Sequence, residues 1–238
     1  MKKLNVIIPC FNEEDSIPQL MGKLQELSIL LEQKYIHTFV FVDDGSTDNT
    51  NFLLQQNQSM VFRSLIVKHE VNQNLGAALK TGIDASSGCD LLAFLDSDCT
   101  YEPAVLVEML REIEDGADLV TVSPYHPLGK VEGVPEWRLL LSKSLSLMYR
   151  IILGTNFHTY TAMVRVIKSE LVKPILSARN DYSFVAAFFI RAIKNKYKIV
   201  EVPAVLKVRR FGVSKINIMK TIKSHLVIIL YLLVGKEI

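Results

Sequence analysis

Cysteine is scarce in this chain, and no apolar stretch is long enough to cross a bilayer. The 238 residues include only three cysteines, Cys10, Cys89 and Cys99, and none of them forms a CxxC pair. We therefore expect neither a disulfide framework nor a zinc site, and a reducing compartment is favoured. The longest apolar run, 226–234, falls short of the roughly 20 residues of a transmembrane helix. The apolar segment at the start ends at Pro9, too early for the apolar region of a signal peptide.

Glycine and proline occur in ordinary numbers, 11 and 8, and charged residues make up 22% of the chain. This composition excludes a collagen-like repeat and a disordered tail. Hydrophobic residues account for 49% of the chain, and its length suits one domain with a sizeable core.

Charge is unevenly distributed, although the formal net charge is only +2. Residues 1–129 carry 8 Lys/Arg and 19 Asp/Glu, whereas residues 130–238 carry 19 Lys/Arg and 6 Asp/Glu. One explanation is that the two halves simply have differently charged, solvent-exposed surfaces, as in many soluble proteins. The alternative, which the motifs below favour, is an acidic half that binds a metal ion and a basic half that faces phosphate or anionic lipid.

The first 125 residues alternate between short apolar runs and segments with helical spacing. Strands are predicted at 5–9, 38–42, 64–67, 91–95 and 118–122, and helices at 15–33, 50–58, 75–85 and 102–114. This order indicates βαβ units, so the predicted fold is α/β, with a mainly parallel sheet and helices on both faces. Several strands are apolar without alternation, as expected for strands that are covered on both faces.

The second half of the chain has a different pattern. A loop is predicted at 125–136, a strand at 199–208 and helices at 137–153, 182–193 and 214–234. The first and last of these helices are amphipathic and combine many large apolar side chains with lysine or arginine. They either pack in an ordinary core or lie at a membrane surface, and the adjacent basic residues favour the membrane surface.

Acidic residues follow three of the predicted parallel strands: Glu13 follows the first, Asp43 and Asp44 the second, and Asp96 and Asp98 the fourth. Because ligands bind beyond the carboxyl ends of parallel strands, these loops are expected to meet at one site. Paired carboxylates suit Mg²⁺ or Mn²⁺ when phosphate oxygens complete the coordination. For each segment, a turn or helix start capped by aspartate is the simpler alternative.

The segment 72–80 opens a predicted helix with small residues, including Gly76, which would let the backbone approach a nucleotide closely. It contains neither the GxxxxGK[ST] pattern of a P-loop nor the GxGxxG pattern of a dinucleotide fold. Kinase and NAD-dependent functions are therefore disfavoured. A carboxylate such as Asp44 could instead accept hydrogen bonds from a base or a ribose.

Four segments together resemble the inverting glycosyltransferases of family 2, which have the GT-A (Rossmann-like) fold. They are 6–13 (VIIPCFNE), 42–48 (VDDGSTD), 74–78 (NLGAA) and 95–98 (LDSD). The resemblance implies that the nucleotide of a nucleotide-diphosphate sugar is bound by Pro9, Phe11, Glu13, Asp43, Asp44, Gly76 and Ser97. It also implies that Asp96 and Asp98 are catalytic and hold Mg²⁺ or Mn²⁺ against the diphosphate.

Later segments resemble the polyprenol-phosphate mannose synthases of that family. They are 129–138 (GKVEGVPEWR), similar to the acceptor loop of those enzymes, 200–203 (VEVP) and 209–215 (RRFGVSK). The match implies that Arg138, Ser142, Arg209 and Lys215 contact the acceptor phosphate. The two amphipathic helices lie where those synthases have interface helices.

The expected organisation is a single GT-A domain over 1–238. The half at 1–125 would bind the nucleotide sugar and the metal ion. The half at 126–238 would bind the acceptor through its amphipathic membrane-interface helices.

Some positions depart from the pattern of those synthases. Residues 123–125 (SPY) stand where they have an SRY-type arginine, Thr100 replaces a glutamine, and Thr159 and Ala187 replace acidic residues. Asp181 lies where other family members have an ED motif, whose aspartate is the general base for a sugar hydroxyl. Asp181 is therefore a candidate catalytic base for a saccharide acceptor.

These features predict a metal-dependent inverting glycosyltransferase that is peripheral on the cytoplasmic, inner face of a membrane. It would transfer a hexose, mannose or glucose, from a GDP- or UDP-linked sugar to polyprenyl or dolichyl phosphate. Besides these substrates and the membrane surface, a membrane protein or a second copy is a candidate partner, and nucleic acid is not expected. Two alternatives remain: a family 2 enzyme that acts on a saccharide hydroxyl with Asp181 as base, and a non-catalytic nucleotide-sugar-binding protein.

Overall fold

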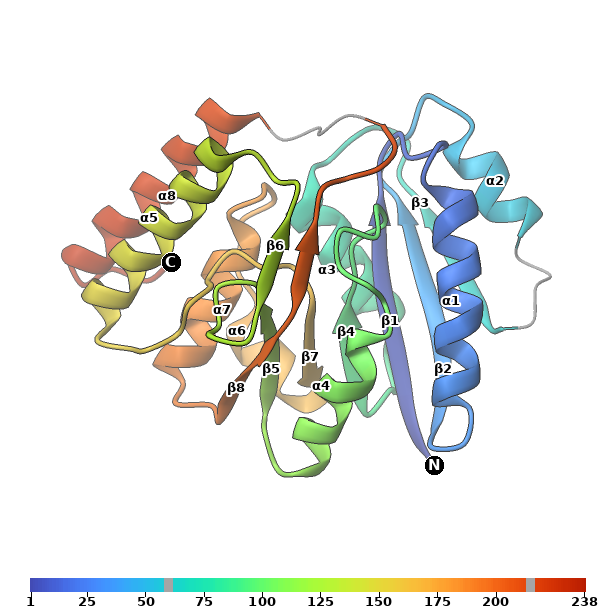
Figure 1. Cartoon of the computed structure of the whole chain (residues 1–238), viewed down its shortest axis with the longest axis horizontal. Helices are drawn as coiled ribbons and strands as arrows, with labels where there is room; N and C mark the ends of the chain where they lie inside the picture. Colours follow the sequence, from blue (N-terminus) through green and yellow to red (C-terminus); the bar gives the residue numbers. More distant parts are fainter. Residues whose placement is uncertain (58–61, 213–216) are drawn as a thin grey trace.

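Seven strands form the central sheet of the computed structural model, which describes residues 1–57, 62–212 and 217–238 (Figure 1). The strand order is β3-β2-β1-β4-β7-β5-β8, and within it only β7 runs antiparallel to its neighbours. The strands are β1 (Lys2–Cys10), β2 (Tyr35–Asp43), β3 (Ser64–Lys68), β4 (Leu91–Phe94), β5 (Leu119–Ser123), β7 (Arg165–Lys168) and β8 (Ile199–Pro203). The prediction of a mainly parallel α/β sheet is confirmed.

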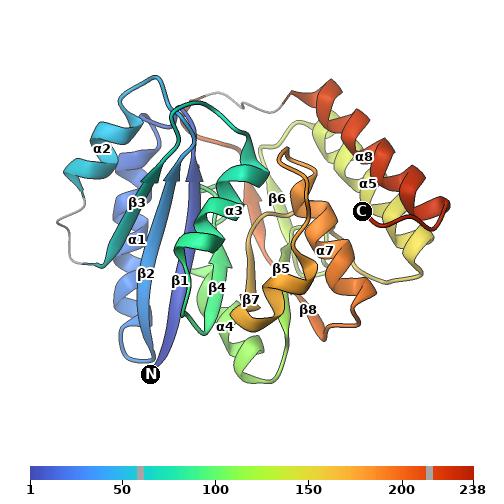
Figure 2. The same ribbon diagram turned by 180° about the vertical axis from the view of Figure 1, so that it is seen from behind.

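Helices cover both faces of the sheet, as the two opposite views show (Figures 1 and 2). One face carries α1 (Ile17–Leu31), α2 (Thr50–Gln56) and α4 (Val105–Glu114). The other carries α3 (Leu75–Ala85), α6 (Val172–Ile175), which follows a 3₁₀ turn at Ser169–Leu171, and α7 (Phe184–Lys194). The prediction of helices on both faces is confirmed.

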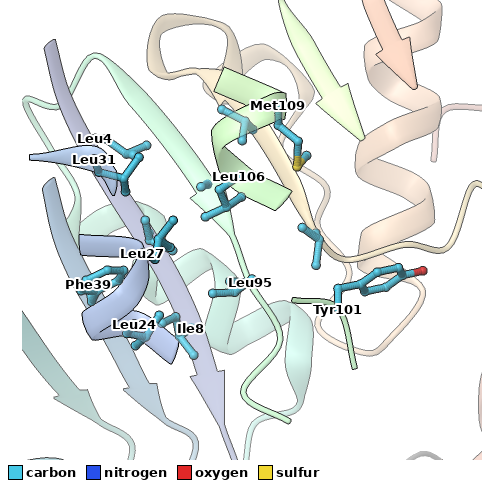
Figure 3. Packing of buried hydrophobic residues seen from close by; sticks show 14 of the residues in the cluster. Leu4, Ile8, Leu24, Leu27, Leu31, Phe39, Leu95, Tyr101, Leu106 and Met109 are labelled. Carbon is cyan, nitrogen blue, oxygen red and sulfur yellow. The ribbon is translucent and has the colours of Figure 1, made fainter. Parts of the chain in front are cut away.

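The two faces hold separate apolar clusters, and β1 contributes to both. Leu4 and Ile8 point into the cluster under α1 and α4, part of which Figure 3 shows. Ile7, between them in the sequence, belongs to the cluster under α3 and α7. All three side chains are fully buried, which explains why this strand is apolar without alternation.

Parallel pairing aligns the ends of the strands that precede the acidic loops. Cys10 of β1 is paired with Asp43 of β2, and Ile7 of β1 is paired with Phe94 at the end of β4. The three loops that follow β1, β2 and β4 therefore start at the same edge of the sheet.

A small second sheet joins two segments of the C-terminal half. β6 (Lys130–Glu132) pairs in parallel with β9 (Val205–Lys207). The strand predicted at 199–208 is thus two strands, β8 and β9, which are separated at Ala204. The Ala204 N–H donates to the Ser123 carbonyl at 3.1 Å, and the Ala204 carbonyl accepts from the Lys130 N–H at 3.0 Å. The prediction of a continuous loop at 125–136 is wrong at β6.

The last two long helices, α5 (Glu136–Leu153) and α8 (Ile218–Leu233), lie side by side at the end of the molecule opposite α1 and α2 (Figures 1 and 2). Only Ser146 and Tyr149 of α5 are buried. Exposed apolar side chains of the pair are Trp137, Leu140, Leu141, Leu147, Met148, Ile151, Met219, Leu226, Val227, Leu230, Tyr231 and Leu233. Among the helices that the structure describes, none is long and apolar enough to span a membrane.

Candidate active site

A cavity of about 910 Å³ opens at the carboxyl ends of β1, β2 and β4 and continues between α5 and α8. Of the residues that the sequence predicts for the site, those that line it are Pro9, Phe11, Glu13, Asp44, Asp96, Ser97, Asp98, Arg138, Ser142 and Arg209. The four carboxylates in this set come from the loops after the parallel strands. The groove between the helices adds mostly apolar side chains, such as Leu145, Ile222 and Ile229.

Glu13 is held rigidly in the loop after β1. Its backbone N–H donates to the Thr50 hydroxyl at 2.7 Å, and the Ser16 hydroxyl donates to Glu13 Oε2 at 3.0 Å. Burial raises the pKa of Glu13, and the nearby positive charge of Arg209 opposes this shift. The second carboxylate oxygen, Oε1, accepts a hydrogen bond from the Arg209 guanidinium.

Asp44, in the loop after β2, is surrounded by hydrogen-bond donors. Its Oδ1 lies 2.7 Å from His69 Nδ1 and accepts from the Gln73 N–H at 2.8 Å, while Oδ2 accepts from Asn72 Nδ2 at 2.9 Å. The other ring nitrogen of His69 lies 2.9 Å from the Thr81 hydroxyl of α3. These contacts fix the carboxylate at the wall of the cavity.

Asp43 is fully buried and does not belong to the cavity lining. Its Oδ1 accepts from the Ser46 N–H at 2.9 Å, which stabilises the turn at Gly45. A Cβ on Gly45 would lie 2.5 Å from the Val71 carbonyl carbon, so this turn requires glycine. Asp43 Oδ2 is buried without a hydrogen-bond partner in the described part of the chain, and its role toward a nucleoside stays a prediction.

The loop after β4 carries Asp96, Ser97 and Asp98 into the cavity. Burial, reinforced by the negative charge of Asp98, raises the pKa of Asp96. The Thr100 N–H donates to Asp98 Oδ1 at 3.1 Å. Two carboxylates crowded at one strand end are the hard oxygen donors that Mg²⁺ or Mn²⁺ prefers, so the residues fit such an ion. Among the described residues, no three His, Cys, Asp or Glu side chains are grouped so that they could hold a metal ion.

Three of the four non-glycine residues with positive φ angles in the described chain lie in the same loops. Asn12, Asn74 and Cys99 have φ angles of 53°, 74° and 53°, whereas the fourth, Lys196, follows α7. Asn tolerates this region, whereas it is uncommon for cysteine. The three residues follow β1, precede α3 and follow β4, so each strained residue sits beside a segment that lines the cavity. This concentration is typical of a functional site.

Arg209 reaches the acidic loops from the segment that follows β9. Its Nε donates to Asp98 Oδ2 at 3.0 Å, and its Nη2 donates to Glu13. The base of the segment is anchored because the Lys207 N–H donates to the Thr100 carbonyl at 2.9 Å and Lys207 Nζ lies 2.9 Å from Glu102 Oε1. Arg209 therefore joins the acidic loops after β1 and β4 to the C-terminal half of the chain.

The other predicted acceptor residues lie on α5 or outside the described structure. Arg138 and Ser142 line the cavity one helical turn apart, and the Ser142 hydroxyl is 3.5 Å from the Thr161 hydroxyl. The Arg138 guanidinium lies 5.3 Å from the centre of the Trp137 ring. Lys215 falls outside the described residues.

A network that sequence reasoning missed supports the wall near Thr159. Glu201 of β8 accepts hydrogen bonds from the N–H groups of His158 and Thr159 and lies 2.6 Å from His158 Nδ1. The Thr159 hydroxyl lies 2.7 Å from the Ser123 hydroxyl. Thr159 lines the cavity, as do Thr100 and Pro124. At Thr100, Pro124 and Thr159 the chain departs from the sequence pattern of the synthases described above, and these differences therefore change the surface of the cavity.

Asp181 is placed differently from an exposed catalytic base. Its Oδ1 accepts from the N–H and the hydroxyl of Ser183 at the start of α7, and its Oδ2 accepts from the Ser224 hydroxyl of α8 at 2.6 Å. Burial alone raises the pKa of Asp181, but the hydrogen bonds from Ser183 and Ser224 outweigh it and lower the pKa. Its side chain does not line the cavity, whereas the neighbouring Tyr182 does. These contacts favour a structural role, in which Asp181 forms a turn before α7 and ties that turn to α8.

Gly76 lies where α3 meets the start of α7, and its role toward a nucleotide stays a prediction. A Cβ at Gly76 would lie 2.7 Å from the Asn180 carbonyl carbon and 2.7 Å from Phe184 Cβ. The glycine thus allows α3 to pack against the start of α7, and it is not part of the cavity lining.

Comparison with known proteins places most of the chain in one family. The sequence pattern of Glycosyl transferase family 2 matches residues 5–176. The polyprenol monophosphomannose synthase of Mycolicibacterium smegmatis is 34% identical over 218 residues, which cover 89% of this chain and 80% of that protein. The dolichol-phosphate mannosyltransferase of Pyrococcus furiosus is 30% identical over 227 residues, which cover 94% of this chain but only 62% of that protein.

A solved structure with a similar fold is the glucosyl-3-phosphoglycerate synthase of Mycobacterium tuberculosis in complex with Mn²⁺, UDP-glucose and phosphoglyceric acid. It aligns with a TM-score of 0.71 and 20% sequence identity, over 99% of this chain and 80% of that one. At this identity the likeness concerns the fold alone.

Proposed function

Because the chain belongs to glycosyl transferase family 2 and is therefore a glycosyltransferase, we propose that it transfers a hexose from a nucleotide-diphosphate sugar to polyprenyl phosphate with inversion. The observation that carries this proposal is the continuity of the cavity. One opening joins the acidic loops after β1, β2 and β4 to the apolar groove between α5 and α8. A donor that is polar and an acceptor that is a lipid can thus meet in it.

The donor half of the proposed site is the wall formed by residues 1–125. Asp44, fixed by His69 and Gln73, is an acceptor for the N–H groups of a base or the hydroxyls of a ribose. Asp96 and Asp98 would hold Mg²⁺ or Mn²⁺ beside the diphosphate. When bound, such an ion neutralises the negative charge that develops on the departing nucleoside diphosphate. The solved enzyme with Mn²⁺ and UDP-glucose supports this placement by its fold.

The acceptor half of the proposed site is the wall formed by residues 126–238. Arg138 and Ser142 of α5 face the cavity from the side opposite the acidic loops, and Arg209 lies between the two sides. An arginine fork suits a phosphate monoester. The relatives named for polyprenol and dolichol phosphate support a lipid acceptor of this kind, with mannose as one candidate sugar.

A phosphate acceptor would need no general base. A phosphate monoester is already anionic at neutral pH, since its second pKa is about 6. Its oxygen can attack the anomeric carbon without transferring a proton to the enzyme. Asp181 is engaged by Ser183 and Ser224 and therefore gives no support to the alternative saccharide acceptor.

We propose that the protein is peripheral on the cytoplasmic, inner face of a membrane, and the pair formed by α5 and α8 supports attachment to a membrane surface. Leu140 and Ile151 of α5 are 67% and 71% exposed, and Leu230 and Leu233 of α8 are 56% and 66% exposed. Apolar side chains of this number, next to lysine and arginine on the same helices, are typical of helices that lie in the headgroup region. The groove between them would deliver the lipid phosphate to the catalytic loops.

The proposal is tested by transfer of radiolabel from GDP-mannose, UDP-glucose or UDP-N-acetylglucosamine to a short polyprenyl phosphate in the presence of Mn²⁺. We expect label in the organic phase with one of the donors. Asp98→Ala should abolish it, whereas Asp84→Ala, an exposed carboxylate of α3, should leave it unchanged. Label that stays in the aqueous phase with every donor would exclude the lipid acceptor, and full activity of Asp98→Ala would exclude the proposed metal ligand.

A further inference from the structure

The positively charged Arg209 side chain lies between the acidic loops that follow β1 and β4. Its guanidinium joins Asp98, through Nε at 3.0 Å, to Glu13, through Nη2. Both ion pairs are shielded, since the side chains of Arg209, Asp98 and Glu13 are only 16%, 20% and 7% exposed. Arg209 is therefore an internal counter-ion. Its positive charge offsets the negative charges of Asp98 and Glu13, which are costly to bury.

The same carboxylate is one of the two proposed ligands of the divalent ion. Asp98 Oδ2 accepts a hydrogen bond from the Arg209 guanidinium, and Asp98 Oδ1 accepts one from the Thr100 N–H. A divalent ion that coordinates Asp98 would stand next to the guanidinium, and two positive charges at that distance repel each other. The bridge to Arg209 and a bound ion would therefore weaken each other at Asp98.

The segment that carries Arg209 allows the side chain to leave without unfolding its surroundings. From β9 it runs toward the ends of β1 and β2 (Figures 1 and 2). Lys207 stays fixed through the Thr100 carbonyl and Glu102, and the Val208 N–H donates to the Glu132 carbonyl at 2.9 Å. Arg209 follows directly, so its long side chain can turn from the donor loops toward α5, which lines the opposite wall of the same cavity.

We propose that Arg209 competes with the divalent ion for Asp98, and that binding of the ion with the nucleotide sugar releases the guanidinium to receive the acceptor phosphate. This inference rests on the proposed function and deepens it by assigning an order of binding. The donor and its ion bind first because the acceptor lacks one of its arginines until they do. By linkage, an acceptor phosphate must also strengthen binding of the ion.

The competition is tested by measuring the affinity for Mn²⁺ with electron paramagnetic resonance of the free ion, with UDP and with GDP in parallel. Removal of the competing charge in Arg209→Gln should tighten Mn²⁺ binding about tenfold, which corresponds to about 1.4 kcal/mol. Arg209→Lys keeps the charge but cannot bridge both carboxylates, so it should fall between the wild type and Arg209→Gln. The matched control is Arg210→Gln, an adjacent and exposed arginine whose loss changes the net charge equally.

The release is tested by binding of a short polyprenyl phosphate, followed through the fluorescence of Trp137. This residue is the only tryptophan of the chain and lines the same cavity. In the wild type, Mn²⁺ with the nucleotide that binds should tighten acceptor binding severalfold. In Arg209→Gln this enhancement should disappear, and in Arg210→Gln it should persist.

The outcomes separate the inference from the proposed function. If the wild type binds Mn²⁺ but Arg209→Gln binds it no more tightly than Arg210→Gln, the competition is refuted while the glycosyltransferase proposal stands. If the acceptor binds the wild type equally well with and without Mn²⁺ and nucleotide, the assigned order is refuted. If no variant binds Mn²⁺ with either nucleotide, the metal dependence of the proposed function fails and this inference fails with it.

Discussion

The hydroxyl of Tyr149 lies 2.9 Å from Nδ1 of His225, and this contact joins α5 to α8 beside the cavity. Tyr149 is fully buried and His225 is 5% exposed. Burial lowers the pKa of His225 to about 4, and the nearby Asp181 opposes this shift only in part. The imidazole is therefore neutral at physiological pH and can accept a hydrogen bond from the tyrosine.

Protonation of His225 should make the helix pair less stable in acid. Above pH 6.5 the imidazole is neutral in both the folded and the unfolded chain. Between pH 6.5 and 4 the unfolded chain takes up a proton that the folded chain does not, so the free energy of unfolding falls as the pH falls. The largest loss is about 3 kcal/mol. About 2 kcal/mol of this loss falls between pH 7 and pH 5, where urea unfolding measures it.

The comparison with His225→Gln isolates this residue from other groups that titrate in the same range, such as His37, whose pKa burial also lowers. The variant should be less stable at pH 7 yet lose less stability than the wild type on going to pH 5. Equal losses in the two proteins would show that His225 does not titrate in this range.

The positions of the helices and parallel strands of the first half follow from local pattern. The predicted helix at 75–85 coincides with α3, and the carboxyl ends of the strands place the acidic loops together, as parallel topology requires. β7 could not be predicted in this way. It is four residues long, and Arg165 within it is fully buried. Its guanidinium donates to the carbonyls of Tyr160 and Val185, partners that only the tertiary fold supplies.

The sequence indicates which residues belong to the candidate site, but not how they contact one another. Glu13, Asp44, Asp96 and Asp98 are recognised from sequence because each lies in a short motif that follows a predicted strand. The contact between Arg209 and Asp98 joins residues 111 positions apart, and no local pattern specifies it. Gly76 shows why a small residue is ambiguous in a sequence, because it can serve the packing of two helices as readily as the approach of a ligand.

Arg138 should matter for the acceptor more than for the donor. It lines the cavity from α5, on the wall opposite the carboxylates. Arg138→Ala should raise the KM for polyprenyl phosphate about tenfold or more, the worth of a charge-assisted hydrogen bond, and change the KM for the nucleotide sugar little. Lys143→Ala on the same helix, whose ammonium lies over the Tyr125 ring, is the control. Equal effects of Arg138→Ala on both substrates would contradict the assignment.

The exposed apolar side chains of α5 should bind lipid bilayers. Co-sedimentation of the full chain with vesicles that contain anionic lipid measures this directly. Placing charges on this exposed apolar surface, as in Leu140→Asp with Ile151→Asp, removes apolar contact with the lipid and adds charge repulsion, so at least a tenfold loss of binding is expected. Leu30→Asp offers a matched control, because Leu30 of α1 is 55% exposed at the other end of the molecule. Equal losses in the two proteins would show that α5 is not the membrane-binding surface.

Asp181 distinguishes the phosphate acceptor from the saccharide acceptor. Asp181 accepts hydrogen bonds from Ser183 and Ser224, and asparagine keeps one side-chain oxygen that can accept them. Asp181→Asn should therefore lower the free energy of unfolding by only about 1 kcal/mol. Transfer to polyprenyl phosphate should then remain within about threefold of the wild type, because no step needs a proton acceptor at this place. A general base would behave differently, since its loss lowers kcat by about 10²-fold to 10⁴-fold. Measurement of kcat beside thermal unfolding of Asp181→Asn separates the two roles, and a collapse of kcat in a folded variant that still binds the donor would restore Asp181 as the catalytic base.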